Sequence, residues 1–456
     1  MIRRTLQRAF GLWALMCLAT AAGAQSSGLD SIIDRDLASL VGTYKTLHAA
    51  PELSHHEEKT AAFVAGQWRA MGYAVTEHVG KYGNPNWAGY GVVAVLKNGE
   101  GPTVLVRTEL DALPVEEQTG LPYASRVRTV NDLGQDVGVM HACGHDIHIT
   151  ALLGAAQVLA DLKDQWHGTL MLIAQPAEET GDGARAMLAD GLYTRFPKPD
   201  YAIAQHDAAG LAAGRVGYCP GFALASATSV DVTIRGRGAH GSQPQASKDP
   251  IVAAAEFVLA LQTIVSRENS PFDPAVVTVG SIHGGSKNNI IPDEVKMQLS
   301  IRTYSEKVRE RILASIERVA KGIAETDGLP EDRPPLVTVT ESTPATYNDP
   351  SLTDRLAQVF VKTLGAANVE KMTPVMASED FGHFGLEGHQ IPICQFSLGA
   401  VDPAKLAESQ RTGVPLPSLH SSRFAPVPEP TIRTGVKAIT SAVLELMRGE
   451  APNPTR

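Results

Sequence analysis

Residues 141–148, HACGHDIH, constrain this chain more than any other stretch, because they place three histidines, one thiol and one carboxylate within eight residues. They directly precede an apolar pattern of helical period at residues 149–162. Imidazole, thiolate and carboxylate groups are the usual protein ligands of Zn²⁺. The pair Cys143 and His145 is a weak metal signal by itself, since Asp146 at a helix entrance can simply be a helix cap. Residues farther along the chain favour the metal interpretation.

The chain has 456 residues, of which 43% are hydrophobic and 20% charged, as in an ordinary soluble globular protein. This length exceeds the size at which one hydrophobic core stops growing, so we expect two domains. The formal net charge of −9, without any run of basic residues, argues against a nucleic-acid partner.

The first residues are typical of an export signal. Arg3, Arg4 and Arg8 precede an apolar run at residues 12–22 that is too short to cross a bilayer, and Ala-Gly-Ala at 22–24 is an A-x-A cleavage site. We therefore predict a signal peptide at residues 1–24 and a periplasmic or secreted mature protein without membrane attachment.

After that cleavage three cysteines remain, Cys143, Cys219 and Cys394. An odd number in an exported chain indicates that at least one is outside a disulfide, and metal binding would account for Cys143. Whether Cys219 and Cys394 pair is left open.

Polar residues follow three predicted strands at the point where each strand ends. Glu109 and Asp111 stand at the end of the strand 103–110, Pro-Ala-Glu-Glu at 176–179 follows the strand 168–175, and His206 follows the strand 201–205. The carboxyl ends of parallel strands line one crevice of an open α/β sheet, so we expect these side chains to share a site. The alternation of side chains along a strand would also turn Glu109 and Asp111 the same way.

Two adjacent glutamates can both face one site only where the backbone turns, because side chains alternate along a strand. Pro176 supplies such a break just before Glu178 and Glu179. One carboxylate could then bind a metal while the other transfers protons to and from water, which is the division of roles that hydrolysis needs.

The middle of the chain has a different pattern from its surroundings. Its order of predicted elements is β-α-β-β-α-β, the ferredoxin-like unit: strand 229–235, a helix capped by Asp249, strands 275–282 and 294–303, a helix capped by Ser305, and strand 336–340. The predicted fold is therefore α/β with two domains, a mixed open sheet flanked by helices and an inserted ferredoxin-like βαββαβ domain. The predicted boundaries are the signal peptide 1–24, the catalytic domain 25–221, the inserted domain 222–341, the second part of the catalytic domain 342–449 and a frayed tail 450–456.

Six motifs, in this order along the chain, resemble a known family. They are PELS at 51–54, DALP at 111–114, HACGHD at 141–146, PAEE at 176–179, NIIP at 289–292 and SEDF at 378–381. The resemblance is to metal-dependent amidohydrolases related to hippurate hydrolase and to auxin-conjugate (IAA-amino acid) hydrolases, within the aminoacylase and carboxypeptidase metallopeptidase superfamily. It covers residues from about 30 to 447.

The resemblance implies a site with two divalent metal ions and one general base. Glu178 would be the base, and Asp111 would orient a metal ligand. The ligands would be Cys143, His145, Glu179, His206 and His420. This mixed set of donors suits Zn²⁺, with Mn²⁺ or Co²⁺ as alternatives.

The resemblance also gives roles to residues of the inserted domain, which would serve as a dimerisation or lid domain. His240 would reach across a homodimer, or a higher homo-oligomer, to the developing oxyanion, and Asn289 and Arg302 would hold the carboxylate of the substrate. Two positions differ from the family pattern. Glu109 stands where relatives more often have Asp, and Gln245 follows Pro244 where they usually have His, which bears on the range of substrates.

The expected function is hydrolysis of the amide bond of an N-acyl amino acid or a small peptide-like amide by metal-activated water. One alternative is a carboxypeptidase or dipeptidase of the same superfamily. An alternative of another class is a binding protein with an inactive site on the same fold. That alternative would predict the loss of a ligand or of the base, and the sequence retains all of them.

Overall fold

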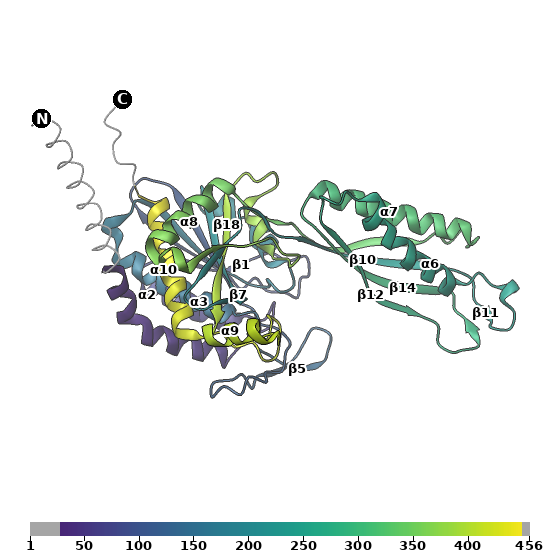
Figure 1. The fold of residues 1–456 in the computed structure, drawn as a ribbon, viewed down its shortest axis with the longest axis horizontal. Helices are drawn as coiled ribbons and strands as arrows, with labels where there is room; N and C mark the ends of the chain where they lie inside the picture. Colours follow the sequence, from purple (N-terminus) through teal and green to yellow (C-terminus); the bar gives the residue numbers. More distant parts are fainter. Residues whose placement is uncertain (1–27, 449–456) are drawn as a thin grey trace, which may run out of the picture. The chain divides into compact units, whose positions relative to one another are not determined.

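The structure, a computed structural model, describes residues 28–448 (Figure 1). The predicted signal peptide and the predicted tail at 450–456 lie outside the described residues. The described chain forms two compact units. The first unit holds the residues up to Tyr218, then Asp349–Met372, and the residues from Gln390 onward, and the second holds Cys219–Asn348 and Thr373–His389.

An eight-stranded mixed sheet forms the centre of the first unit, in the spatial order β1-β2-β6-β3-β7-β18-β8-β17. The four neighbours β6, β3, β7 and β18 are parallel, whereas β1, β2 and β8 run antiparallel to a neighbour. The strands are β1 (Ala74–Val79), β2 (Gly91–Asn98), β3 (Thr103–Glu109), β6 (Gly168–Gln175), β7 (Tyr201–Ala212), β8 (Val216–Tyr218), β17 (Val369–Lys371) and β18 (Ile393–Val401). A short hairpin, β4 (Arg128–Val130) with β5 (Asp136–Gly138), forms a separate two-stranded sheet. Because β3, β6 and β7 are parallel neighbours, their carboxyl ends meet at one edge, as predicted.

Helices flank this sheet, which confirms the predicted mixed α/β class. They are a helix over residues 28–48, α2 (Glu58–Ala70), α3 (His145–Asp161), α4 (Gly183–Ala189), α5 (Leu192–Arg195), α8 (Pro350–Leu364), α9 (Pro403–Thr412) and α10 (Pro428–Leu446). α3 is buried on nearly all sides and packs against α10 and β3. After its polar first turn, α3 is rich in Ile, Ala and Leu residues, which favours its position in the core.

The second unit contains a four-stranded antiparallel sheet in the order β12-β14-β10-β15. Its elements follow one another as β-α-β-β-α-β: β10 (Ser226–Arg235), α6 (Pro250–Thr263), β12 (Ala275–Gly284), β14 (Glu294–Thr303), α7 (Glu306–Thr326) and β15 (Leu336–Thr343). The Asp249 side chain caps α6 by accepting from the N–H of Ile251, as predicted, whereas Ser305 precedes α7 without a side-chain cap bond. One face of the sheet packs on both helices through alternating residues such as Val230, Val232 and Ile234.

The segment Thr373–His389 belongs to the second unit, although we assigned all of residues 342–449 to the catalytic domain. The reason is backbone pairing that the sequence pattern does not show. Val375 bridges to Leu224 of β9 (Gly221–Leu224), and the Ala225 N–H donates to the Ala377 carbonyl at 2.9 Å. β9 also pairs with β16 (Thr346–Asn348), so three separate stretches of chain meet there.

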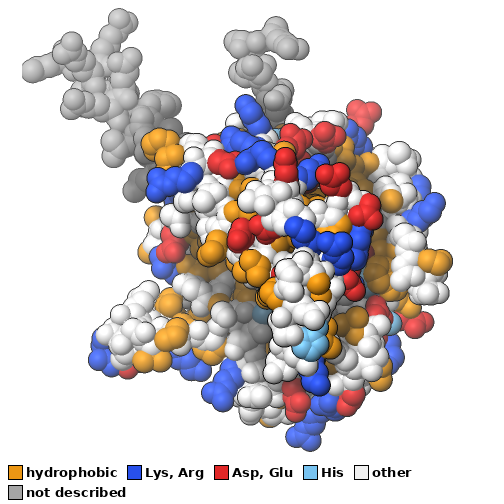
Figure 2. Space-filling model, turned by 90° about the vertical axis from the view of Figure 1, so that its right-hand side faces the viewer, with side chains coloured by type: hydrophobic (Ala, Val, Ile, Leu, Met, Phe, Trp, Pro, Cys, Tyr) orange, Lys and Arg blue, Asp and Glu red, His pale blue; other side chains and the backbone are white. Residues whose placement is uncertain are grey.

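Among the described residues one helical stretch, Pro250–Glu268, is long and apolar enough to cross a membrane by length and composition alone. Its apolar residues Ala253, Phe257 and Leu261 are buried in the core of the second unit. Other large apolar residues of the same helix, such as Val252 and Leu259, are exposed. On the face shown in Figure 2, basic and acidic side chains are interspersed.

Candidate metal centre

The HACGHD motif forms the entrance to α3. Gly144 is the N-cap residue with φ 82°, and a Cβ atom built there would lie 2.4 Å from Oδ2 of Asp207. Glycine is therefore required between Cys143 and His145 both for the left-handed backbone and for space. The helix begins at His145, four residues earlier than the apolar pattern predicted. Asp146 is not its cap, which corrects one of our interpretations.

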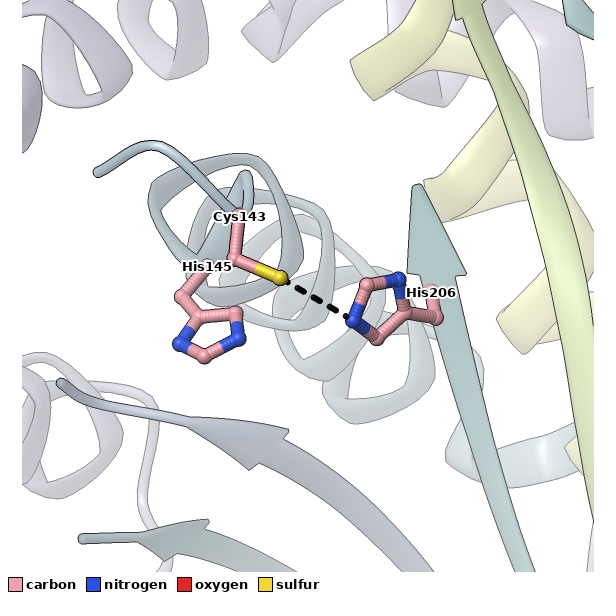
Figure 3. Close-up of side chains that lie close together, drawn as sticks. All are labelled: Cys143, His145 and His206. Atoms are coloured by element: carbon pink, nitrogen blue, oxygen red, sulfur yellow. Dashed lines mark hydrogen bonds between the residues drawn. The ribbon is translucent and has the colours of Figure 1, made fainter. Parts of the chain in front are cut away.

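Cys143 and His206 face each other across the edge of the sheet (Figure 3). Sγ of Cys143 lies 3.5 Å from Nε2 of His206, and Nδ1 of His206 donates to the Asp207 carbonyl at 2.9 Å. This bond places the ring proton on Nδ1, so the lone pair of Nε2 points toward the sulfur. His206 lies within β7, which extends to Ala212 and so continues well past the predicted strand end.

The buried imidazole of His145 has the geometry of a metal ligand. Its Nδ1 donates to the Asp111 carbonyl at 2.8 Å, and a backbone bond of this kind commonly orients a ligating histidine. No residue of the described chain is within hydrogen-bond distance of Nε2. The nearest acids are Glu178, with Oε2 at 3.7 Å, and Glu179, with Oε1 at 3.9 Å. A buried acceptor nitrogen without a donor costs free energy, and a cation bound to Nε2 would remove that cost.

Glu178 and Glu179 lie in a turn directly after β6. Ala177, the residue before them, has φ 52°, so the backbone turns there as the Pro-Ala-Glu-Glu sequence predicted. The N–H of Glu179 donates to Oδ2 of Asp111 at 2.9 Å, and Oε2 of Glu179 lies 3.5 Å from Nε2 of His420. Both acids therefore face the cluster.

His420 reaches the site from a loop between α9 and α10. Its φ is 65°, an uncommon backbone conformation for a residue other than glycine, and its N–H donates to the Ala142 carbonyl at 2.8 Å. This bond joins the late loop to the HACGHD motif. His420 has no motif around it in the sequence, and this backbone hydrogen bond holds it next to the HACGHD motif.

The structure brings all five predicted ligands together with Glu178. The ligand atoms of Cys143, His145 and His206 lie within 4.8 Å of one another, and so do those of Cys143, Glu179 and His420. The two groups share the Cys143 sulfur. His145 also groups with both glutamates within the same limit. Sulfur, nitrogen and oxygen donors in this number are suited to divalent ions such as Zn²⁺.

Asp111 connects several parts of the site. Its Oδ2 accepts from Ser54 Oγ at 2.7 Å as well as from the Glu179 N–H. Burial opposes its charge, but His145 and Ser54 lower the pKa of Asp111 below its ordinary value. β3 ends at Glu109, so strand alternation does not apply to Asp111, contrary to our expectation for this pair.

Next to the candidate ligands lies a hydrogen-bonded series of buried polar side chains that we had not predicted. Nδ1 of His148 donates to Oε2 of Glu109 at 3.0 Å, and Nε2 of the same ring accepts from the Asp207 N–H at 2.8 Å. Glu109 also pairs with the buried Arg107. Although burial opposes ionisation, Arg107 and His148 hold the pKa of Glu109 well below its ordinary value. The available signal was the spacing of His145 and His148, which share one face of α3.

The predicted residues of the inserted domain lie in the second unit. His240 is in β11 (Ala239–His240), which pairs with β13 (Ile290–Ile291), and the Gly241 N–H donates to the Asn289 carbonyl at 2.8 Å. Ser242 donates to Nδ1 of His240 from its hydroxyl at 2.8 Å and from its N–H at 3.1 Å. Nε2 of His240 therefore carries the ring proton and is the available donor.

Arg302 is not near His240 and Asn289 within this unit. It lies near the end of β14, whereas β11 and β13 lie beyond the beginning of that strand (Figure 1). The eight residue-to-residue steps from Glu294 to Arg302 span about 26 Å of extended strand. One unit therefore cannot place all three residues on one small substrate.

Cys219 and Cys394 do not form the disulfide that the sequence left open. Burial raises the pKa of the Cys394 thiol to about 12, as expected of a thiol in an apolar core.

Comparison with known proteins identifies the family. The model of "Peptidase family M20/M25/M40" matches residues 105–420. The chain belongs to this family. It is accordingly a metal-dependent hydrolase of the amidohydrolase and peptidase type, which confirms the resemblance found in the six motifs.

Two relatives in the M20 family carry names of specific activities. The chain is 38% identical to hippurate hydrolase of Campylobacter jejuni, over 74% of this chain and 82% of that protein. It is 36% identical to N-acetyl-L-cysteine deacetylase of Bacillus subtilis, over 76% of this chain and 77% of that protein.

Solved structures share the fold across almost the whole chain. A protein from methicillin-resistant Staphylococcus aureus, assigned as an aminohydrolase, superposes with a TM-score of 0.78 at 30% identity, over 92% of this chain and 100% of that one. A Bacillus subtilis protein described as a dinuclear metal-binding peptidase of the M20 family gives a TM-score of 0.71 at 24% identity, over 91% of this chain and 99% of that one.

Proposed function

We propose that this enzyme hydrolyses the amide bond of N-acyl amino acids and releases a carboxylic acid and a free amino acid. The observation that carries the proposal is the pair of donor groups that share Cys143, with Glu178 beside them. Two relatives support the proposal by sequence identity, a hippurate hydrolase and an N-acetyl-L-cysteine deacetylase. Both are named for cleaving an acyl group from an amino acid.

We propose further that the site holds two divalent ions. One set of ligands would be Cys143, His145 and His206, and the other Cys143, Glu179 and His420, with the thiolate shared. The relative described as dinuclear supports the number of ions, and the donor set favours Zn²⁺, with Mn²⁺ or Co²⁺ as alternatives. Such ions polarise a carbonyl group and lower the pKa of water.

Glu178 is the general base of the proposed reaction. Its Oε2 lies 3.7 Å from Nε2 of His145, so its carboxylate stands beside the ligand atoms. It takes a proton from the attacking water and then gives that proton to the amide nitrogen as the carbon–nitrogen bond breaks. Asp111 holds His145 and the Glu179 backbone in position while this happens.

His240 donates to the oxyanion of the tetrahedral intermediate from Nε2, the nitrogen that Ser242 leaves available. Asn289 and Arg302 hold the carboxylate of the amino acid. Because Arg302 lies at the far end of β14 from His240 and Asn289, the proposal requires residues from two copies of the chain. It therefore includes a homodimer or a higher homo-oligomer.

A panel of substrates on metal-reconstituted protein tests the function. N-benzoyl, N-acetyl and indole-3-acetyl amino acids are compared with dipeptides and with carboxyl-terminally extended peptides by release of free amino acid. The proposal expects kcat/KM for at least one N-acyl amino acid to exceed that for every peptide by tenfold or more. A preference for peptides would favour the carboxypeptidase or dipeptidase alternative, and no turnover of any substrate with both ions bound would favour the inactive binding protein.

We also propose export to the periplasm or the medium, on the basis of residues 1–24. Expression of the full chain in a Gram-negative host, followed by fractionation and amino-terminal sequencing, checks this. The expected mature terminus is Gln25, and a chain that stays in the cytoplasm with its first residues intact would contradict the proposal.

A further inference from the structure

Glu57 is a buried carboxyl group that the reaction described so far does not use. It occupies the N-cap position of α2, yet its side chain does not cap that helix. An acidic residue at this position usually accepts from the N–H groups of the first helical turn. Here Glu52 takes that role, because its Oε2 accepts from the N–H and the hydroxyl of Thr60 at 2.8 Å each.

The Glu57 side chain instead binds two backbone N–H groups outside the helix. Its Oε1 accepts from the His55 N–H at 3.0 Å and from the Ala177 N–H at 2.7 Å. These two residues have φ values of 67° and 52°, in the left-handed region that residues with a Cβ rarely adopt. One carboxyl oxygen thus holds two strained residues from distant parts of the chain.

Ala177 immediately precedes the proposed base, Glu178. The Ala177 carbonyl is held as well, since it accepts from the Gly183 N–H at 3.1 Å. The peptide groups on both sides of Ala177 are therefore fixed, and with them the direction in which Glu178 leaves the backbone. Without Glu57 the buried N–H of Ala177 would lose its acceptor, which favours a different backbone conformation of the turn.

The other residue bound by Glu57 connects to the same site. His55 directly follows Ser54, whose hydroxyl donates to Oδ2 of Asp111. Oδ2 of Asp111 also accepts from the Glu179 N–H. Glu57 therefore contacts both the loop that supports Asp111 and the turn that carries the two glutamates.

We propose that Glu57 is a positioning residue, which holds residues 176–179 in the left-handed turn that directs Glu178 toward the cluster. The inference rests on the proposed role of Glu178 as the base. The feature that acts is the acceptor oxygen Oε1. Burial raises the pKa of Glu57 well above its ordinary value, with a further contribution from Asp111, and this agrees with a role that requires an acceptor but no charge.

The test compares Glu57→Ala and Glu57→Gln with a matched control, Glu52→Ala. Glutamine keeps an acceptor oxygen at the same position, and Glu52→Ala removes a carboxylate from the same loop without touching Ala177. With N-benzoylglycine or the best N-acyl amino acid of the panel, Glu57→Ala should lower kcat by 10- to 100-fold, with KM and bound metal within threefold of the wild type. Glu57→Gln should recover most of kcat, and Glu52→Ala should lower Tm with little change in kcat.

A second measurement does not depend on activity. Hydrogen exchange of a peptide that covers residues 175–184 should become faster in Glu57→Ala and stay close to the wild type in Glu57→Gln. Wild-type exchange and kcat in Glu57→Ala would overturn the inference, and so would equal losses of kcat in Glu57→Ala and Glu57→Gln.

A double variant separates this inference from the proposed function. If Glu57 acts through Glu178, adding Glu57→Ala to Glu178→Gln should lower the residual kcat by less than threefold. If Glu57→Ala lowers the kcat of Glu178→Gln by the same factor as it lowers that of the wild type, the positioning role is overturned. Wild-type turnover of Glu178→Gln alone would instead remove the proposed base, whatever the Glu57 variants do.

Discussion

Glu178 and Glu179 are neighbours in the chain, but their surroundings differ. Glu179 is bonded through its N–H to Asp111, and its Oε2 lies 3.5 Å from the imidazole of His420, so it is held among the proposed ligands. Glu178 lies in one group of possible ligands with His145 and Glu179, and its Oε2 is 3.7 Å from Nε2 of His145. At the scale of single residues, the contact between Glu179 and His420 supports Glu179 as a ligand in the proposed site, and the role of Glu178 as the base stays a proposal.

Glu178→Gln should bind metal normally and lose nearly all turnover. Glutamine is similar in shape but cannot accept the proton of the attacking water, and loss of a general base typically costs about 10²- to 10⁴-fold in rate. Elemental analysis and kcat on the same preparation check both parts. Turnover at the wild-type rate would remove Glu178 from the mechanism.

Cys143→Ala provides the contrast, because it removes a ligand and leaves Glu178 in place. Bound metal should fall by at least one ion per chain, since both donor groups lose their shared sulfur. Added metal should restore the number of bound ions per chain only in part. An unchanged stoichiometry would count against the thiolate as a ligand.

At the scale of elements, the helix over residues 28–48 is joined to the start of α3 by a buried ion pair network. His48 donates from Nδ1 to Asp146 at 2.7 Å and from Nε2 to Glu117 at 3.1 Å. Burial opposes its charge, but the bonds to these two carboxylates raise the pKa of His48 to about 10. A histidine that donates from both nitrogens is an imidazolium, so the positive charge is part of this contact.

His48→Phe should lower the free energy of unfolding by about 3 kcal/mol at pH 7, because it leaves two buried carboxylates without their cation. The folded-state pKa of His48 lies above the ordinary value of about 6.5, so its contribution is complete below pH 6.5 and is lost as the pH rises toward 10. The difference in stability between the wild type and His48→Phe should therefore shrink between pH 7 and pH 10.

Urea denaturation at a series of pH values, with metal saturating, measures this difference. His56→Phe is the matched control, since His56 pairs with Asp132 at 3.0 Å but both side chains are about half exposed. Exposed pairs contribute little, so this control should change stability by less than about 1 kcal/mol at every pH. A constant difference for His48→Phe from pH 7 to pH 10 would contradict a protonated His48.

At the scale of the whole molecule, the positions of the three residues proposed to bind substrate bear on assembly. Arg302 lies near the end of β14, whereas His240 and Asn289 lie at the separate β11–β13 pair beyond the beginning of that strand, so the roles proposed for all three residues require two copies of the chain. Substitution of His240 in one copy and of Glu178 in another would therefore inactivate different parts of the proposed site.

Mixing His240→Ala with Glu178→Gln should restore activity. Each variant alone is expected to be nearly inactive, but subunit exchange in equal amounts should yield sites that combine intact residues, up to about one quarter of wild-type activity per chain for random pairing of a dimer. Activity after exchange under mild denaturant, together with mass measured by light scattering, checks this. Exchange proven by mixed labels without recovered activity would show that His240 does not act across subunits.

Much of the fold and of the site could be predicted from the sequence, because the signals are local. Apolar runs located β3 and β6, and apolar alternation located β10, to within a few residues; the polar residues at the ends of β3 and β6 marked the edge where the candidate site lies. The spacing of Cys143 and His145 and the turn at Pro176 are local signals, because each depends on residues within a few positions of one another. The family resemblance added His420, which no local pattern marks.

The tertiary structure alone decided which polar side chains meet across long stretches of chain. Ser54 and Glu57 have the spacing of a helix capping box, but they bind Asp111 and Ala177 instead. His48 reaches Asp146, and residues 373–389 pair with the second unit. The candidate ligands Cys143 and His145 could thus be predicted from the HACGHD sequence itself, because the ligand chemistry of a side chain is local. The geometry of this motif depends on partners 30 to 280 residues away, because hydrogen bonds between distant segments exist only once the chain has folded.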